Sequence, residues 1–232
     1  MRIIADVMSG DLGEKEAVIG AFTAANQNKI QLLLVGNKEK TEEIMRQNHL
    51  SSPYVSVFPV NDVLTMDDSP LSVIREKKDS SMAVGLKLLA EGKGDAFVSA
   101  GNTGALLAGA TFLVRRIPGV KRAGIGTILP FEKPLLLLDS GANLDLSPED
   151  AIVFALMGQI YMNKMFAVAS PLIGQLNIGA ESGKGTPRKI EIYKALSECS
   201  LLRFTGNVEP KKIPFHPCDV LITDGLTGNI AL

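Results

Sequence analysis

The chain of 232 residues is 46% hydrophobic and 21% charged, which is typical of a globular protein with a sizeable core. Its 24 basic and 25 acidic residues leave a formal net charge of −1, which argues against a nucleic-acid-binding protein. The length allows one large α/β domain or two small ones. Because no linker or composition break marks a boundary, we expect a single domain over residues 1–232.

The cysteines and the apolar segments indicate in which cellular compartment the protein is expected. Cys199 and Cys218 form no CxxC pair, which favours a cytoplasmic protein with reduced thiols. The N-terminus runs directly into an apolar strand pattern, so we expect no signal peptide. No apolar run approaches the ~20 residues that a membrane-spanning helix needs.

Short apolar runs alternate with longer amphipathic ones along the chain. Strands are predicted over residues 3–7, 31–35, 54–59, 95–99, 126–129, 135–138, 172–176 and 220–223. Helices are predicted over residues 14–26, 38–48, 80–91, 102–115, 148–162 and 187–201. This order predicts a three-layer α/β/α sandwich with a mostly parallel sheet and ligands at the carboxyl ends of its strands.

Residues 96–110 read as a buried strand, a glycine turn and a helix of small residues. Gly101 permits backbone angles closed to other residues, and Asn102 or Thr103 can cap the helix. The free N–H groups and positive dipole end of such a helix favour phosphate. An ordinary capped turn explains the same residues, so the stretch alone identifies no enzyme.

Five predicted strands end in an acid or amide close to glycine, and parallel pairing brings such ends to one edge of a sheet. This pattern favours a binding site over isolated turns. The five ends are Asp6 to Asp11, Ser99 to Asn102, Asp139 to Asn143, Asn177 to Gly179, and Asp224 to Asn229.

Several common motifs are absent. The segment from Gly179 to Thr186 resembles a P-loop but has Ile178 in place of the first glycine and Gly185 in place of the magnesium-binding Ser/Thr. No G-x-G-x-x-G follows a strand and no G-x-S-x-G occurs. His49 and His216 are expected on the surface or in a loop, and the two histidines and two cysteines do not form a zinc motif. Aspartates at the strand ends would hold magnesium only if they converged, and turn roles explain most of them, so we expect no metal or cofactor.

Taken together, the motifs resemble the bacterial phosphate acyltransferases of phospholipid synthesis, which make acyl phosphate from acyl–acyl carrier protein. The matching segments stand in family order across essentially the whole chain. They are Ile4 to Asp11, Lys78 to Met82, Asp95 to Ala105, Leu138 to Asn143, Phe154 to Gly158, Leu176 to Gly179 with Lys184-Gly185, Phe204 to Glu209, and Asp224-Gly225 with Gly228-Asn229.

Two departures accompany the resemblance. The family's first loop usually reads Met-Gly-Gly-Asp-His-Ala-Pro, whereas this chain has Ser9 for a glycine and Leu12 for the histidine. The family also continues for a substantial portion beyond the position of Leu232, a portion associated with membrane contact. We therefore expect exposed apolar surface near the buried strand at 220–223, covered in at least a homodimer, and weaker membrane association than in a longer relative.

The resemblance implies an isocitrate dehydrogenase-like or phosphotransacetylase-like fold and attack of inorganic phosphate on an acyl thioester. Its implied partners are acyl carrier protein and inorganic phosphate, with peripheral membrane contact. The implied site residues fall into three groups: Ser99, Gly101, Asn102, Thr103 and Gly104 for phosphate; Lys184, Asn177 and Asp224 for catalysis; and Asp6, Asp11, Asp139 and Asn143 for ordering loops.

Three alternatives stay open. A short-chain phosphate acetyl- or butyryltransferase would share fold and chemistry and differ in acyl pocket and carrier. A decarboxylating hydroxy-acid dehydrogenase would need a nucleotide site and a metal triad, of which only the charges of Arg115, Arg116 and Arg122 are present. A non-catalytic phosphate- or acyl-binding protein would bind these ligands without turnover.

Overall fold

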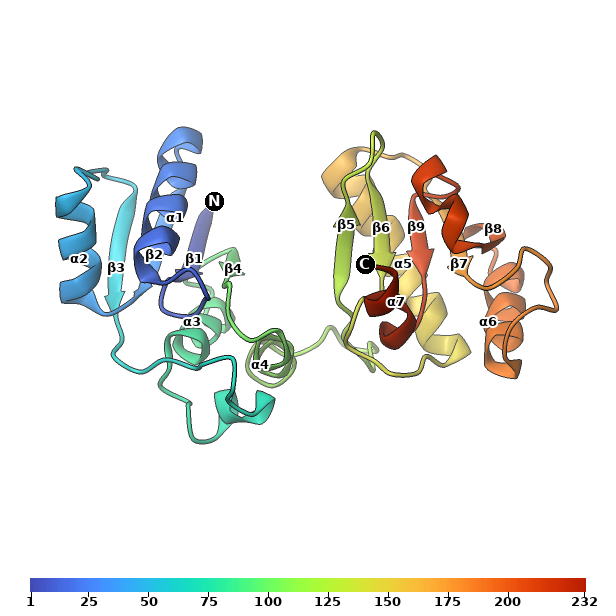
Figure 1. Cartoon of the computed structure of the whole chain (residues 1–232), viewed down its shortest axis with the longest axis horizontal. Coiled ribbons are helices and arrows are strands. Elements are labelled where there is room, and N and C mark those ends of the chain that lie inside the picture. Colours follow the sequence, from blue (N-terminus) through green and yellow to red (C-terminus); the bar gives the residue numbers. More distant parts are fainter. The chain divides into compact units, whose positions relative to one another are not determined.

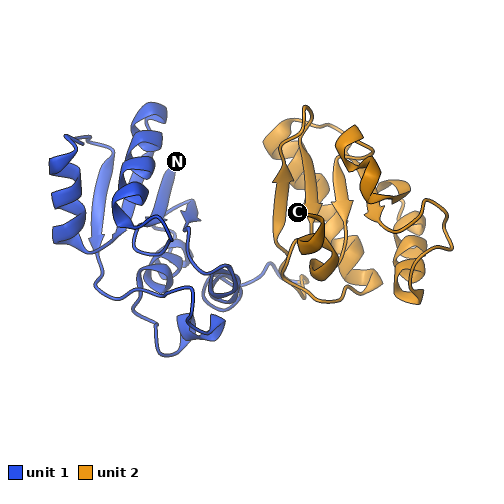
Figure 2. Cartoon of the chain, in the orientation of Figure 1, with its two compact units in different colours: residues 1–118 blue, residues 119–232 orange.

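The computed structural model describes residues 1–232, and the chain divides into two compact units, Met1–Pro118 and Gly119–Leu232 (Figure 2). Each unit contains its own β-sheet. The α/β class and the predominance of parallel pairing are confirmed, with the strands divided between two sheets. The single-domain assignment stays a prediction. No helix has both the length and the hydropathy needed to cross a membrane.

Unit 1 contains a four-stranded sheet of order β3-β2-β1-β4, in which every pair is parallel (Figure 1). Its elements are β1 (Arg2–Asp6), α1 (Glu14–Asn28), β2 (Gln31–Gly36), α2 (Lys38–Gln47), β3 (Val55–Pro59), η1 (Pro70–Ile74), α3 (Ser81–Ala90), β4 (Ala96–Val98), α4 (Thr103–Gly109) and the π-helical turn η2 (Ala110–Val114). α4 and η2 together occupy most of the predicted 102–115 helix.

Alternating side chains place helices on both faces of this sheet. Ala5 of β1 packs with Val18 of α1 and Ile44 of α2 in one buried cluster. The next residue back along β1, Ile4, packs with Leu88 of α3 in another. Successive side chains of a strand point to opposite faces, so α1 and α2 cover one face and α3 the other. Unit 1 is therefore the predicted α/β/α sandwich.

Unit 2 contains a five-stranded sheet of order β5-β6-β9-β7-β8, in which only β5 and β6 pair antiparallel. Its elements are β5 (Gly126–Leu129), β6 (Leu135–Leu138), α5 (Pro148–Phe166), β7 (Leu172–Leu176), α6 (Pro187–Glu198), β8 (Arg203–Val208), η3 (Pro210–Phe215), β9 (Val220–Ile222) and α7 (Gly225–Ala231).

The two faces of the second sheet are covered differently. Phe154 of α5 and Leu196 of α6 pack with Leu136 of β6 on one face. On the other face, Leu137 packs with Ile213 of the short η3 helix. A long helix therefore covers only one face of this sheet, and the third layer is built from η3 and loop residues.

The structure adds four elements that the sequence analysis did not predict, namely η1, η3, β8 and α7. β8 includes Gly206, which has φ +100, and the pairing of β7 with β8 shifts register between Ile173 and Gly174. Glycine and register irregularity weaken the alternation on which strand prediction depends. α7 follows β9 directly, with Asp224 as its N-cap, and this helix of seven residues was not among the predicted helices.

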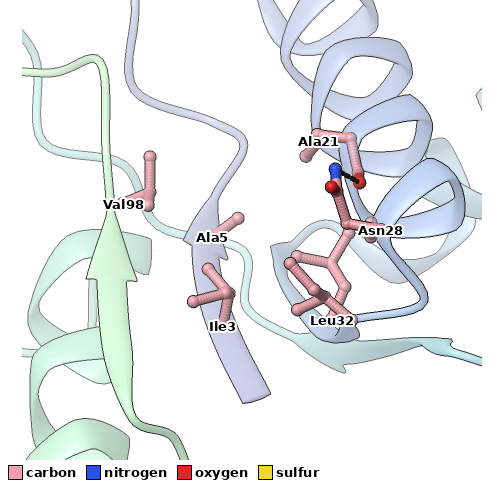
Figure 3. Close-up of a pocket in the computed structure, with 9 residues that line it drawn as sticks. Ile3, Ala5, Ala21, Asn28, Leu32 and Val98 are labelled. Atoms are coloured by element: carbon pink, nitrogen blue, oxygen red, sulfur yellow. Dashed lines mark hydrogen bonds between the residues drawn. The ribbon is translucent and has the colours of Figure 1, made fainter. Parts of the chain in front are cut away.

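Unit 1 also has an apolar cavity of about 190 Å³ between α1 and the sheet (Figure 3). Ile3, Ala5, Leu32 and Val98 line it, and its one polar side chain is Asn28. Asn28 Nδ2 donates to the Ala24 carbonyl at 2.8 Å, so this amide is already satisfied by its own helix. The cavity therefore offers apolar surface and no group suited to catalysis.

Candidate functional site

Asp6, at the end of β1, connects two loops at the carboxyl edge of the first sheet. Its Oδ1 accepts hydrogen bonds from the backbone N–H groups of Met8 at 3.1 Å and Ser9 at 3.3 Å. Its Oδ2 accepts a 2.8 Å bond from Ser99 Oγ, which itself accepts the Gly101 N–H at 3.1 Å. Asp6 is only 4% exposed. This arrangement suits the predicted role of Asp6 in ordering loops.

Gly101 is glycine for a reason other than the predicted backbone angle. Gly101 is not among the glycines of the chain with positive φ, so the turn does not use that part of glycine's conformational freedom. A β-carbon added to Gly101 would lie 2.5 Å from Ser9 Cβ and 3.0 Å from Met82 Cε. Close approach of the two loops, rather than a special dihedral angle, excludes a side chain here.

Asn102 caps α4, as predicted. Its Oδ1 accepts the Ala105 N–H at 3.0 Å, and its Nδ2 donates to the carbonyl groups of Met66 and Asp68, each at 3.1 Å. The whole side-chain amide is thus committed to holding the loop. The backbone N–H of Thr103 belongs to the first turn of α4 and has no acceptor within the helix.

A cavity of about 250 Å³ lies beside these loops and is lined by residues 8–11 and 63–66. Ser9 lines it, is 3% exposed, and its Oγ has no hydrogen-bond partner. Asp11 also lines the cavity but is exposed, and no hydrogen bond of its carboxylate connects it to the neighbouring loops. Its predicted loop-ordering role therefore has no bond to support it.

Asp139 organises the corresponding loop at the end of β6 in unit 2. It is fully buried, and its Oδ1 accepts the N–H groups of Ile125, Gly141 and Ala142 at 3.1, 3.1 and 3.0 Å. Its Oδ2 accepts both the N–H and the Nδ2 of Asn143, at 2.8 and 2.7 Å. Five donors satisfy the buried carboxylate, which suits loop ordering by Asp139 and Asn143.

Asn177 braces the loop that follows β7. Its Oδ1 accepts the Ile178 N–H at 2.8 Å, and its Nδ2 donates to the Lys184 carbonyl at 3.1 Å. Gly185 has φ +90, and a β-carbon there would lie 2.6 Å from Asn177 Oδ1, so glycine is required on both grounds. The Lys184 side chain extends from this loop as an exposed residue.

Asp224, at the start of α7, is held from two sides. Its Oδ1 accepts the Thr227 N–H at 2.7 Å and its Oδ2 the Thr227 Oγ at 2.8 Å. Lys189 Nζ lies 2.9 Å from Asp224 Oδ2 and 3.3 Å from Thr223 Oγ1. Burial acts to raise the pKa of Asp224, but the bonds from Thr227 and Lys189 outweigh it and hold the pKa below its ordinary value.

A cavity of about 480 Å³ lies at this edge of the second sheet. Lys189 is the only charged residue that lines it. Asn177, from the loop after β7, and Thr227, from the start of α7, line the same cavity. The expectation that all five strand ends lie at one edge of a single sheet is wrong, because β1 and β4 belong to the first sheet and β6, β7 and β9 to the second. That the ends of the two sheets share a cleft stays a prediction. The full lining is Leu176, Asn177, Ile178, Gly185, Thr186, Lys189, Pro210 and Thr227.

Cys218 and His216 do not contribute a nucleophile or base to the edge of the second sheet. Burial, with a smaller effect from the neighbouring Asp219 carboxylate, raises the pKa of the Cys218 thiol to about 12, so this thiol stays protonated at neutral pH. His216 Nε2 lies 3.1 Å from Asp219 Oδ1 at the opposite, amino-terminal end of β9. No cluster of three or more His, Cys, Asp or Glu side chains has a metal-binding arrangement.

Comparison with known proteins decides the family. The family model described as "Fatty acid synthesis protein" matches residues 1–232. The chain belongs to the fatty acid synthesis protein family. Within it, the curated protein "Phosphate acyltransferase" of Clostridium tetani is 41% identical over 234 residues, covering 100% of this chain and 70% of the relative. The protein of the same name from Elusimicrobium minutum is 42% identical over 234 residues, covering 100% and 68%. The resemblance predicted from the sequence is confirmed.

Solved structures support the fold. A phosphotransacetylase from Streptococcus pyogenes matches with a TM-score of 0.71 at 15% identity, covering 99% of this chain and 79% of that one. A 4-hydroxythreonine-4-phosphate dehydrogenase from Burkholderia phymatum matches with a TM-score of 0.57 at 15% identity, covering 95% and 79%. These matches confirm the phosphotransacetylase-like and dehydrogenase-like α/β fold.

Two side chains at these edges escaped the sequence analysis. Lys189 lies in the first turns of α6, where its spacing gives no sign that it reaches Asp224. Ser9 was noticed only as a departure from the family's first loop, and its unpartnered hydroxyl becomes visible only once the structure shows its neighbours.

Proposed function

We propose that this protein is a phosphate acyltransferase that transfers an acyl group from acyl–acyl carrier protein to inorganic phosphate. The observation that carries the proposal is identity of about 40% over the whole chain to curated relatives named phosphate acyltransferase. The family model, described as a fatty acid synthesis protein, supports the same reading. A role in lipid synthesis follows from that description.

The reaction requires little acid–base chemistry. A phosphate oxygen attacks the thioester carbonyl carbon, the carbon–sulfur bond breaks, and the thiolate leaves and takes up a proton, which yields acyl phosphate and free carrier thiol. Phosphate at neutral pH is largely a dianion, so it needs positioning more than deprotonation. Glycine turns and fixed N–H donors at both sheet edges suit a mechanism based on orientation and electrostatic stabilisation.

We assign phosphate binding to the loop Ser99–Gly104. Ser99 and Asn102 hold the loop through Asp6, Met66 and Asp68. The backbone N–H groups of Thr103 and Gly104 are then the donors left for an anion at the start of α4. In this assignment the side chains of Ser99 and Asn102 shape the loop, and the backbone N–H groups of Thr103 and Gly104, with the exposed Thr103 hydroxyl, contact the phosphate.

We assign the stabilisation of charge on the thioester or phosphate oxygens to the Asn177 loop of unit 2. Lys184 is its exposed cation, and Asn177 holds the backbone of Lys184 in place. Asp224, fixed by Lys189 and Thr227, lies at the same edge and orders the start of α7. Acyl carrier protein is the proposed protein partner, in the cytoplasm, with a homodimer and peripheral membrane contact as further parts of the proposal.

A second candidate, short-chain phosphate acyl transfer from coenzyme A, is favoured by the TM-score of 0.71 to a phosphotransacetylase. Release of free thiol from palmitoyl–carrier protein, palmitoyl-coenzyme A and acetyl-coenzyme A, each with phosphate, separates the two. The main proposal expects the highest kcat/KM with palmitoyl–carrier protein. Preference for acetyl-coenzyme A would support the second candidate, and binding without turnover of any donor would indicate a binding protein.

A further inference from the structure

Ser9 has a buried hydroxyl that the protein itself leaves unused. The residue is 3% exposed, and its Oγ has no hydrogen-bond partner. Buried polar side-chain atoms usually have a partner, and an unsatisfied one carries a desolvation cost. The hydroxyl of Ser9 is therefore a free donor that contributes no hydrogen bond to the stability of the fold.

The position of Ser9 is well defined. Its backbone N–H donates to Asp6 Oδ1 at 3.3 Å, which fixes the residue at the end of β1. A β-carbon built on Gly101 would lie 2.5 Å from Ser9 Cβ and 3.3 Å from Ser9 Oγ. The hydroxyl thus lies directly against the glycine of the proposed phosphate loop. Ser9 also lines the cavity of about 250 Å³ between residues 8–11 and 63–66.

Two other side-chain donors of this loop, Ser99 and Asn102, are already occupied, whereas Thr103 is exposed. A serine hydroxyl has one hydrogen to donate, and Ser99 donates it to Asp6 at 2.8 Å. Both hydrogens of the Asn102 amide face the carbonyl groups of Met66 and Asp68. Between the two serines of this edge, only Ser9 has a hydroxyl hydrogen available for a ligand.

We propose that Ser9 donates its hydroxyl hydrogen bond to an oxygen of a phosphate group bound beside Gly101. The proposal rests on the proposed function, and it adds to that function the side chain of Ser9, which was not among the residues predicted to bind phosphate. Two sources supply this chemistry: inorganic phosphate, and the phosphate ester in the pantetheine arm of the thioester donor. We assign Ser9 to inorganic phosphate because it lies at the loop assigned to that substrate.

Because the Ser9 hydroxyl has no partner, we expect Ser9→Ala to weaken phosphate binding without lowering thermal stability. Without ligand, the substitution removes a desolvated group and breaks no hydrogen bond, so the melting temperature stays the same or rises. With phosphate, the substitution removes a bond to a charged group, so affinity falls by roughly tenfold to a hundredfold. Replacing a serine with a merely structural role would instead lower the melting temperature without ligand and leave the affinity for phosphate unchanged.

The test compares wild type, Ser9→Ala and the control Ser56→Ala, which removes an exposed serine hydroxyl from β3 of the same unit. Thermal unfolding of the full chain is recorded with and without inorganic phosphate, and the KM for phosphate and for the thioester donor is measured separately. We expect Ser9→Ala to lose most of the phosphate-induced stabilisation and to raise the KM for phosphate at least tenfold. The KM for the donor stays constant, and Ser56→Ala behaves as wild type.

Three results would overturn the assignment. One is an unchanged phosphate response in Ser9→Ala, another is a change confined to the KM of the thioester donor, and the third is a wild type that phosphate does not stabilise. Failure of the proposed function looks different, because a wild type that binds phosphate through Ser9 but releases no thiol refutes the reaction and keeps the site.

Discussion

Ser99 Oγ donates a 2.8 Å hydrogen bond to Asp6 Oδ2, joining the ends of β4 and β1 across 93 residues of sequence. The same oxygen accepts the Gly101 N–H, and Asp6 also holds the backbone of Ser9. One buried carboxylate thus determines the relative position of two loops that come from opposite ends of unit 1. The shape of the proposed phosphate site depends on this pair.

Replacing Ser99 by alanine removes the donor to Asp6 and leaves the buried carboxylate one bond short. Since a hydrogen bond to a charged group contributes about 1.5–3 kcal/mol, we expect Ser99→Ala to lower the free energy of unfolding by that amount. Urea denaturation measures it. Ser9→Ala is the matched comparison, because it removes a hydroxyl without a partner. Equal stabilities of the two variants would contradict the assigned hydrogen bonds.

Thr103 is the first residue of α4 and is exposed, so its hydroxyl can face a bound anion. We expect Thr103→Val to raise the KM for phosphate by roughly tenfold to a hundredfold, with no loss of fold, since a bond to a charged group is lost. Steady-state kinetics at varied phosphate concentration check this, with Thr23→Val in α1 as the control. If Thr103→Val keeps the phosphate dependence of wild type, the anion lies elsewhere.

Lys184 is exposed, so removing its charge should leave stability unchanged. We expect Lys184→Met to lower kcat/KM by roughly a hundredfold, within the range found when one electrostatic stabiliser of a transition state is removed. Lys194→Met, in an exposed pair on α6, is the control. Thiol release at fixed phosphate is the readout, and full activity of Lys184→Met would remove this residue from the catalytic assignment.

Asp224 has a pKa below its ordinary value, because the hydrogen bonds from Thr227 and Lys189 outweigh the effect of burial. Its ionised form therefore stabilises the folded protein above the unfolded pKa, and that stabilisation is lost as the pH falls through the lowered folded pKa. We expect Asp224→Asn to destabilise the protein by about 1.5–3 kcal/mol at pH 7 and by less near pH 3. Denaturation across this pH range checks the prediction.

The control for Asp224→Asn is Asp145→Asn, which removes the same charge from a side chain that is 72% exposed. A destabilisation by Asp224→Asn that is constant from pH 7 to pH 3 would show that the charge of Asp224 plays no part. Lys189→Met should weaken the same pH dependence, because it removes one of the two partners that lower the pKa.

Much of the fold was predictable because its signals are local. β6 is a run of four buried leucines, and α5 begins at Pro148, the first residue of the predicted helix, with Ser147 as its N-cap. β8 was not predictable in the same way, because Gly206 interrupts its pattern and its pairing with β7 shifts register at Gly174. The division after Pro118 has no composition signal and emerges only from the packing of two separate cores.

The sequence predicted which loops form the candidate site, but it predicted less well which side chains contact one another. Asp6, Asn102 and Asp139 stand at strand ends, and their loop roles follow from short-range sequence. Which serine has a free hydroxyl depends on a bond across 93 residues, so sequence reasoning chose Ser99 instead of Ser9. The reach of Lys189 from α6 to Asp224 is likewise a tertiary contact.

The most direct test of the central claim is the stoichiometry of acyl transfer to phosphate. Palmitoyl–carrier protein is incubated with the chain and isotopically labelled inorganic phosphate, and free thiol and label in hydroxylamine-sensitive acyl phosphate are counted together. We predict equal amounts of both products, with release of thiol that depends on phosphate. Thiol release that continues without phosphate, or that leaves no label in an acyl phosphate, would contradict the assignment of this protein as a phosphate acyltransferase.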